Sequence, residues 1–171
     1  MYITPYNYPY YATHFERLGM TKKVDWMEFQ ITIPDKMVER LDRIADMAIK
    51  RYGYKVLRFN KISEIKPHII PALQIMNEAF EKLLGAVWRS ERQLLDFSKL
   101  IMLVGNPDYV SVVTDKNDNI IGYGFMAPSI SKAVRESRGR LLPCGIFRIL
   151  RDLKRSKTLD LYSIGVKPEY Q

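Results

Sequence analysis

The side chains that most often carry catalysis or bind metals are scarce in this sequence. Cys144 is the only cysteine, and His14 and His68 are the only histidines. An internal disulfide is therefore excluded, and so is a zinc site built from several cysteine and histidine ligands. No histidine stands near Cys144 in the sequence, and neither histidine has the neighbours of a catalytic triad. We expect Cys144 to be a packing residue, and we predict no metal site.

Basic residues are concentrated in one segment. The chain of 171 residues has a formal net charge of +8, from 27 Lys and Arg against 19 Asp and Glu. Residues 131–157 contain nine of these basic residues and two acidic ones, so this segment carries +7 and the rest of the chain +1. Such an imbalance favours an anionic partner.

The second half of this segment predicts an amphipathic helix. Leucine, isoleucine and phenylalanine alternate there with Arg148, Arg151, Lys154 and Arg155. Helices of this composition lie on anionic membranes or bind nucleic acid. A domain helix with a solvated basic face has the same composition, so that interpretation stays open.

Composition places the chain among ordinary globular proteins. It is 47% hydrophobic and 27% charged, and its length suits one domain or two small ones. No stretch has the roughly 18 to 20 uncharged apolar residues of a membrane helix, and the tyrosine-rich start lacks the features of a signal peptide. We therefore expect a cytoplasmic protein.

Hydrophobic periodicity predicts a chain of mixed helices and strands. The segment 26–33 has the clearest strand pattern, because Met27, Phe29, Ile31 and Ile33 alternate with polar residues. Other strands are predicted at 54–59, 109–114, 119–127 and 159–166. Helices are predicted at 12–18, 34–51, 63–85, 90–104, 129–137 and 142–154.

The end of the chain carries a family resemblance. Residues 160–171 read Asp-Leu-Tyr-Ser-Ile-Gly-Val-Lys-Pro-Glu-Tyr-Gln. They resemble the central strand of the GNAT-type N-acetyltransferase superfamily, which typically ends Val-x-Pro-x-Tyr/Arg-Arg/Gln and enters a Gly-x-Gly/Ala loop. The predicted order of a strand, two helices and a hairpin before this segment also agrees with the family. The resemblance implies a GNAT-like α/β fold with a mixed sheet, incomplete because the pattern stops at Gln171.

In the family, this strand and its loop bind acetyl-CoA, and a helix N-terminus holds the pyrophosphate. The resemblance implies that Ile164, Gly165 and Val166 present backbone groups to acyl-CoA and that Tyr170 and Gln171 begin the cofactor loop. It implies transfer of an acetyl group to a primary amine of a small molecule or peptide. Because the glycine loop is missing here, we expect weak binding of acetyl-CoA and no activity by this chain alone.

Enzymes of this family need a base for the attacking amine. Asp160 and Tyr162 share one face of the predicted strand and are the candidate catalytic residues. Asp160 also fits a solvent-exposed residue at a strand end. Tyr109 and Tyr123, on neighbouring strands, are expected to line a pocket.

The resemblance also suggests a tandem organisation. Residues 12–23, Ala-Thr-His-Phe-Glu-Arg-Leu-Gly-Met-Thr-Lys-Lys, are similar to the closing section of the same superfamily. We therefore expect residues 1–33 to end a first acetyltransferase-like unit, 34–53 to form a connecting helix, and 54–171 to begin a second unit. The basic insert 128–158 replaces a short turn of the family.

Two further expectations concern partners. An open sheet edge should lead to a homodimer, or should be occupied by the segment 26–33. The alternative function is a non-catalytic module that binds anions, either nucleic acid or a membrane surface, through Arg148, Arg151, Lys154 and Arg155. If the chain is instead an enzyme, the insert could cover the substrate cleft and attract acidic substrates or the CoA phosphates.

Overall fold

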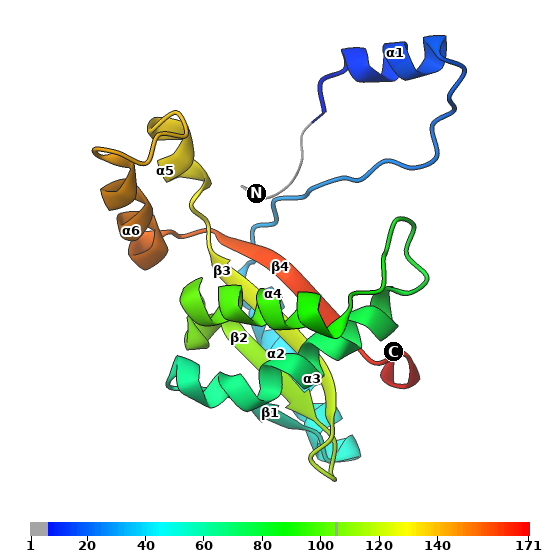
Figure 1. Ribbon diagram of the computed structural model, residues 1–171. Helices are drawn as coiled ribbons and strands as arrows, with labels where there is room; N and C mark the ends of the chain where they lie inside the picture. The colour runs from blue at the N-terminus through cyan, green and yellow to red at the C-terminus, as the bar shows by residue number, and fades with distance from the viewer. Residues whose placement is uncertain (1–6, 105) are drawn as a thin grey trace.

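A four-stranded antiparallel sheet forms the centre of the computed structural model, which describes residues 7–104 and 106–171 (Figure 1). The strands lie in chain order: β1 (Lys55–Leu57), β2 (Val110–Thr114), β3 (Ile120–Pro128) and β4 (Leu159–Val166). The sheet is open, so β1 and β4 are its edges. The predicted mixture of helices and strands is confirmed. The sheet was expected to be mixed, but each strand pair within the described ranges is antiparallel.

Six α-helices accompany the sheet in the described part of the chain. They are α1 (Tyr10–Arg17), α2 (Asp35–Tyr52), α3 (Ile62–Phe80), α4 (Glu91–Val104), α5 (Ser131–Glu136) and α6 (Gly145–Arg155). Short 3-10 turns follow at Pro107–Tyr109 and Pro168–Tyr170. In Figure 1, α3 and α4 lie in front of the sheet, and α5 and α6 protrude from one end of it. Among the residues described, no helix combines the length and the apolar character needed to cross a membrane.

The hydrophobic core lies between α3, α4 and one face of the sheet. Ile69, Leu73 and Met76 recur at helical spacing on α3 and are buried. They pack with Val112 of β2 and Phe125 of β3 in one cluster. Burial of these side chains is the main favourable term that holds the helices on the sheet.

Local signals place the ends of the elements. Ser90 begins α4 with a capping box, in which its hydroxyl accepts from the Gln93 amide (3.4 Å) and the Gln93 side chain accepts from the Ser90 amide (2.9 Å). Gly53 ends α2 with a φ of 72°, where a side chain would be strained. In the β2–β3 turn, Asp115 accepts from the Asn119 side chain (3.0 Å) and from the amides of Asn117 and Asn119. These bonds, that of the Asn119 side chain above all, lower the pKa of Asp115.

The strand predicted at 26–33 is wrong. This segment is extended but belongs to no sheet, and Trp26, Phe29, Ile31 and Ile33 are all exposed. A strand needs a neighbour for its backbone amides and carbonyls, and within the described ranges none lies beside it. The expectation that this segment occupies a sheet edge is therefore also wrong.

Helix α2 confirms the predicted helix at 34–51 but has no buried residue. Its apolar side includes Met37, Leu41 and Ile44, each about half exposed. In Figure 1 it passes behind the sheet, on the side away from α3 and α4. The amphipathic pattern thus predicted the helix correctly without predicting whether its apolar face would be covered.

Two isoleucines differ in burial, and we therefore expect their alanine variants to differ in the free energy of unfolding. Ile75 on α3 is 1% exposed, whereas Ile31 is 71% exposed. Ile75→Ala should lower the free energy of unfolding by about 2 to 5 kcal/mol, because it removes buried methyl groups and leaves a cavity. Ile31→Ala should change it by less than about 0.5 kcal/mol. Urea unfolding measures both, and equal losses would show that residues 26–33 are packed in solution.

Candidate functional site at the edge strand

A tyrosine packed on a glycine joins the two strands at the centre of the candidate site. Tyr123 of β3 lies opposite Gly165 of β4 and is buried. A Cβ atom built on Gly165 would lie 2.6 Å from Cε1 of Tyr123, so the ring rests on the glycine backbone. The Tyr123 hydroxyl is 2.6 Å from the hydroxyl of Ser163, and the two form a hydrogen bond. Gly165 is thus required by the ring above it.

The neighbouring stretch of β4 contains a bulge. Phe125 of β3 pairs with Ser163 and Met126 pairs with Leu161, so Tyr162 has no partner on β3. A bulge changes the direction of the side chains around it and is frequent near active sites. Here Ser163 turns towards α3, with its hydroxyl 3.9 Å from the sulfur of Met76. The Tyr123–Ser163 pair therefore lies where β3, β4 and α3 meet.

The loop between α3 and α4 brings the positive charge of Arg89 near Tyr123. The side chain of the buried Asn77 donates to the carbonyl of Arg89 (2.9 Å) and accepts from its amide (3.0 Å). This pair of bonds fixes the end of the loop. Burial raises the pKa of Tyr123 above its usual value near 10, while the Ser163 hydrogen bond and the Arg89 charge lower it in part. The phenol is therefore protonated at neutral pH.

Two cavities flank these groups. An apolar pocket between α3, α4 and the sheet includes His68, Phe97, Val110, Tyr123 and Ser163 in its lining. A more polar cleft lies between α3 and the β2–β3 turn, where its lining includes Glu78, Asp118 and Lys167. The Tyr123–Ser163 pair therefore borders the apolar pocket, and the polar cleft reaches Lys167, the residue after β4.

The residues predicted to bind the cofactor fall into two groups. Ile164 and Val166 are exposed on β4, and Gly165 between them is buried beneath Tyr123. Tyr170 packs instead against Tyr54 with its ring centre 6.1 Å away, and the Gln171 side chain donates to the Val166 carbonyl (2.9 Å). The turn at Pro168–Tyr170 and Gln171 therefore fold back on β4 and on Tyr54, the residue before β1.

Asp160 lies near Tyr162 but not beside Gly165. Asp160 pairs with Ala127 at the insert end of β4, and five residues of strand separate it from Gly165 by about 17 Å. The carboxylate is buried rather than solvent-exposed, and its Oδ2 atom has no hydrogen-bond partner within the described residues. Burial and then the Asp160 charge raise the pKa of Tyr162.

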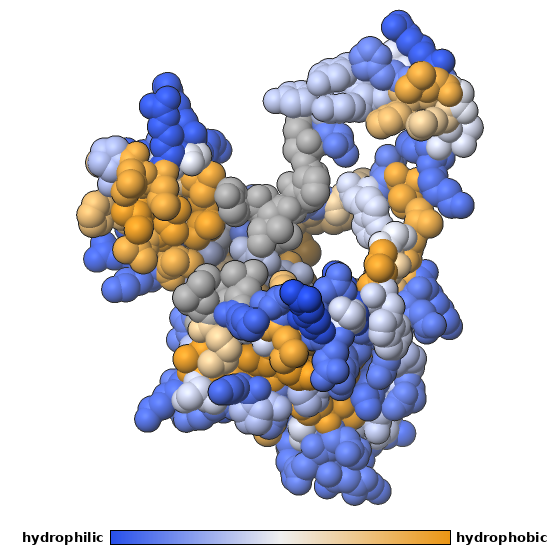
Figure 2. All heavy atoms as spheres, viewed as in Figure 1, coloured by the Kyte–Doolittle hydropathy of each residue, from blue (hydrophilic) through white to orange (hydrophobic). Residues whose placement is uncertain are grey.

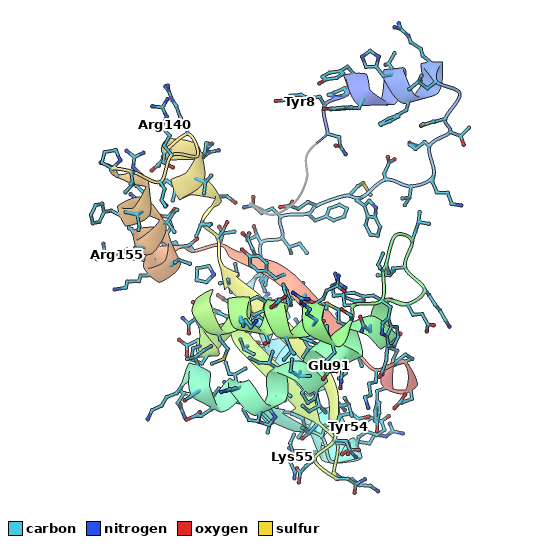
Figure 3. The ribbon with its side chains drawn as sticks, viewed as in Figure 1. Tyr8, Tyr54, Lys55, Glu91, Arg140 and Arg155 are labelled. Atoms are coloured by element: carbon cyan, nitrogen blue, oxygen red, sulfur yellow. The ribbon has the colours of Figure 1, made fainter. Side chains whose placement is uncertain are left out.

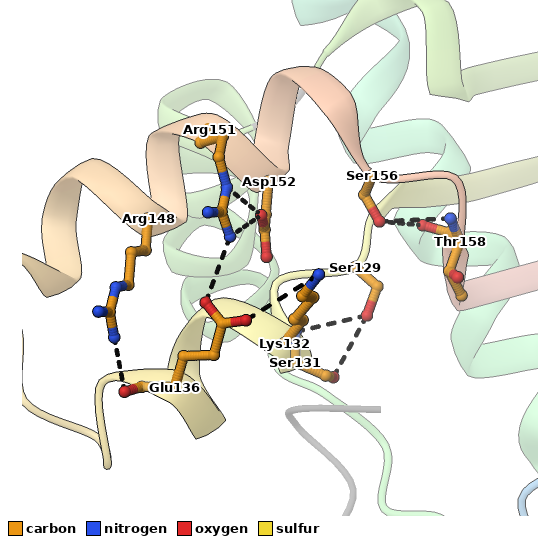
Figure 4. A network of polar contacts seen from close by, with 9 residues as sticks. All are labelled: Ser129, Ser131, Lys132, Glu136, Arg148, Arg151, Asp152, Ser156 and Thr158. Carbon is orange, nitrogen blue, oxygen red and sulfur yellow. Dashed lines mark hydrogen bonds and ion pairs between the residues drawn. The ribbon is translucent and has the colours of Figure 1, made fainter.

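The basic insert is a small helical hairpin held by its acidic residues (Figure 4). Arg151 pairs with Asp152 (2.9 Å) and with Glu136 (3.5 Å), and Arg148 donates to the Glu136 carbonyl (2.6 Å). Two of the four predicted anion-binding residues are therefore already paired inside the protein. Lys154 and Arg155 are exposed and make no ion pair or hydrogen bond with the part of the chain that the structure describes.

Several residues of the candidate site were not predicted. Tyr123 was expected to line a pocket and does so, whereas Tyr109 lies in the 3-10 turn before β2 and lines neither cavity. Ser163, Asn77 and Arg89 received no prediction. The one available signal was the pair of small residues, Ser163 and Gly165, inside an otherwise apolar strand.

The contact between Tyr123 and Gly165 generates a stability prediction. Gly165→Ala should lower the free energy of unfolding by about 1 to 3 kcal/mol, because the added methyl group collides with the ring. Gly124→Ala on β3 is the matched control, since nothing lies within 4 Å of a Cβ at that position. Thermal and urea unfolding measure both. A Gly165 variant as stable as the Gly124 variant would contradict the packing described here.

The raised pKa of Tyr123 predicts a loss of stability at alkaline pH. A phenol whose pKa is higher in the folded state contributes stability below its unfolded pKa, and this contribution is lost as the pH rises through the folded pKa. Unfolding experiments above about pH 10 should therefore show a decline in stability. Tyr123→Phe should make this decline shallower while lowering stability at neutral pH by about 1 kcal/mol. Parallel pH profiles for the two proteins would rule out a titrating Tyr123.

Comparison with known proteins gives one distant relative and no family assignment. No family model matches the chain, and no solved structure matches it significantly. Protein YghO of Escherichia coli (strain K12) is similar, with 25% identity over 179 residues. This alignment covers 98% of the chain and 43% of YghO, so the chain spans less than half the length of that relative.

Proposed function

We propose that this chain forms part of a CoA-dependent N-acyltransferase with a GNAT-like fold, which moves an acetyl or other acyl group from acyl-CoA to a primary amine. The element order supports the proposal, because β1, α3, α4, β2 and β3 precede β4 as in the family that residues 160–171 resemble. The observation that carries it is the site on β4, a bulged edge strand with Ser163, Gly165 and Val166 at its carboxyl end.

An edge strand suits a thioester substrate that carries amide groups. The side of β4 away from β3 has no strand partner within the described ranges, so an added strand could pair with its backbone groups, apart from the Val166 carbonyl, which accepts from the Gln171 side chain. An extended ligand with its own amides can pair with such an edge as an added strand does. Ile164, Gly165 and Val166 would then hold the acyl-CoA arm, and Tyr170 and Gln171 would lie next to its path.

The proposed reaction is direct attack of the amine nitrogen on the thioester carbonyl carbon. The C–N bond forms, the C–S bond breaks, and the thiolate of CoA leaves with a proton. Tyr123 is protonated at neutral pH and hydrogen-bonded to Ser163, which makes its hydroxyl a candidate proton donor for that thiolate. Asp160 and Tyr162 remain the candidate groups for removing a proton from the amine. Because Asp160 is distant from Gly165, it would act through Tyr162 or through water.

The proposed parent protein is a tandem one. Residues 1–33 would end a first unit, α2 would connect it to the second, and residues 54–171 would begin that second unit. The length of YghO, of which the chain spans 43%, leaves room for such an arrangement. Exposed apolar residues at 26–33 and on α2 support it, because further parts of the protein would cover them.

Acetyl-CoA binding by two lengths of the protein tests this proposal. The native coding region should continue beyond codon 171 into a Gly-x-Gly/Ala loop, and the longer protein should bind acetyl-CoA in calorimetry and consume it when a primary amine is added. The 171-residue chain should bind it weakly. Tight, saturable binding by the 171-residue chain would contradict the expectation that part of the acetyl-CoA site lies in the Gly-x-Gly/Ala loop. A stop codon after Gln171 would contradict the proposed enzyme.

A serine pair tests the proposed site within the longer protein. Ser163→Ala should lower kcat/KM by at least about tenfold, because the Tyr123 hydroxyl loses the partner that orients it. Ser98→Ala is the matched control, since among the described residues that hydroxyl donates to the Leu95 carbonyl of its own helix, α4, away from Tyr123. A Ser163 variant with wild-type kcat/KM would exclude this pair from the reaction.

A further inference from the structure

The insert carries an apolar surface that the rest of the described chain leaves uncovered. Phe147 and Leu150 on α6 are 70% and 50% exposed, and Leu142 just before the helix is 73% exposed. Leu141 and Ile146 are exposed beside them. Figure 2 shows a hydrophobic patch on the protruding insert, apart from the sheet. An exposed patch of this kind, with polar residues around it, marks an interaction site.

Positive charges lie directly beside this patch. With 3.6 residues per turn, Lys154 lies on the face between Leu150 and Phe147, and Arg151 and Arg155 follow on the adjoining face. The buried side of α6 is elsewhere, where Asp152 and Gly145 face the insert. Figure 3 shows Arg140 and Arg155 pointing away from the domain. The exposed surface of the hairpin therefore carries apolar and cationic side chains next to one another.

This combination fits one class of partner best. Nucleic acid would use the cations but gain nothing from exposed leucine and isoleucine side chains. A symmetric contact between two copies would bury the leucines but place like charges against one another, which opposes association. An anionic bilayer satisfies both features, because its acyl boundary accepts apolar side chains and its headgroups attract lysine and arginine.

We propose that the α5–α6 insert docks the protein on an anionic lipid surface. Phe147, Leu150 and Leu142 enter the boundary between headgroups and acyl chains, and Lys154 and Arg155 contact the lipid phosphates. Arg151 stays paired with Asp152 and Glu136 and shapes the hairpin instead. This proposal does not depend on the enzymatic one, since it rests on a different part of the molecule.

Vesicle flotation with the 171-residue protein tests the proposal. The protein should bind vesicles of phosphatidylglycerol mixed with phosphatidylcholine, should bind phosphatidylcholine alone far less, and should lose affinity as salt is raised. K154A/R155A should weaken binding about thirtyfold, as expected for two cations near an anionic surface. K36A/K50A on α2 is the matched control and should retain wild-type binding.

A second pair of variants tests whether the apolar patch binds lipid, and distinguishes lipid from nucleic acid and from a second copy of the chain. F147S/L150S should weaken vesicle binding at least about tenfold. V87S/W88S changes exposed apolar residues in the α3–α4 loop and should not. Circular dichroism confirms that each variant is folded. Equal binding by all variants, binding to RNA or duplex DNA but not to vesicles, or a wild-type dimer that F147S/L150S converts to monomers would each overturn the proposal.

Discussion

The ring of Tyr123 lies on the backbone of Gly165, and this contact fixes the relation between β3, β4 and α3. The ring can approach so closely only because residue 165 has no side chain. Its hydroxyl then reaches Ser163, and Ser163 reaches Met76 on α3. Ser163 faces the helix because it pairs with Phe125, whose side chain lies in the core. A change at any of these points would move the others, so the candidate site and the core share the same contacts.

The two faces of the sheet differ in how far their apolar side chains are buried. One face packs against α3 and α4 and is buried, whereas Val56, Leu161 and Ile164 on the strands remain exposed. Helix α2 and the segment 26–33 also keep their apolar residues in solvent. Apolar patterns of this strength usually mark surfaces that are covered in the functional state.

Most of the elements could be predicted from local patterns, because those patterns act over a few residues. The range of β4 was predicted as Leu159–Val166, the start of α4 follows from Ser90, and the end of α2 follows from Gly53. The segment 26–33 fails for a non-local reason, since alternation shows how a strand would place its side chains but not whether a partner strand exists. The contacts of Tyr123 with Gly165, and of Asn77 with Arg89, could not be predicted, since they join residues that no local pattern relates. The burial of Asp160, at the end of β4 next to the insert, could not be predicted either, since no local pattern indicates it.

Strand β4 connects the two regions to which functions are proposed here. The insert enters β4 at Leu159, and the candidate site lies at Gly165 and Val166, at the opposite end of the strand. At about 3.3 Å per residue, the length of the strand separates them by roughly 20 Å. A protein docked through α6 would therefore hold the site at a distance from the bilayer surface instead of against it. The separation also means that changes to Phe147 or Lys154 act on the docking surface without contacting Tyr123 or Ser163, so the two proposals can be tested independently in one protein.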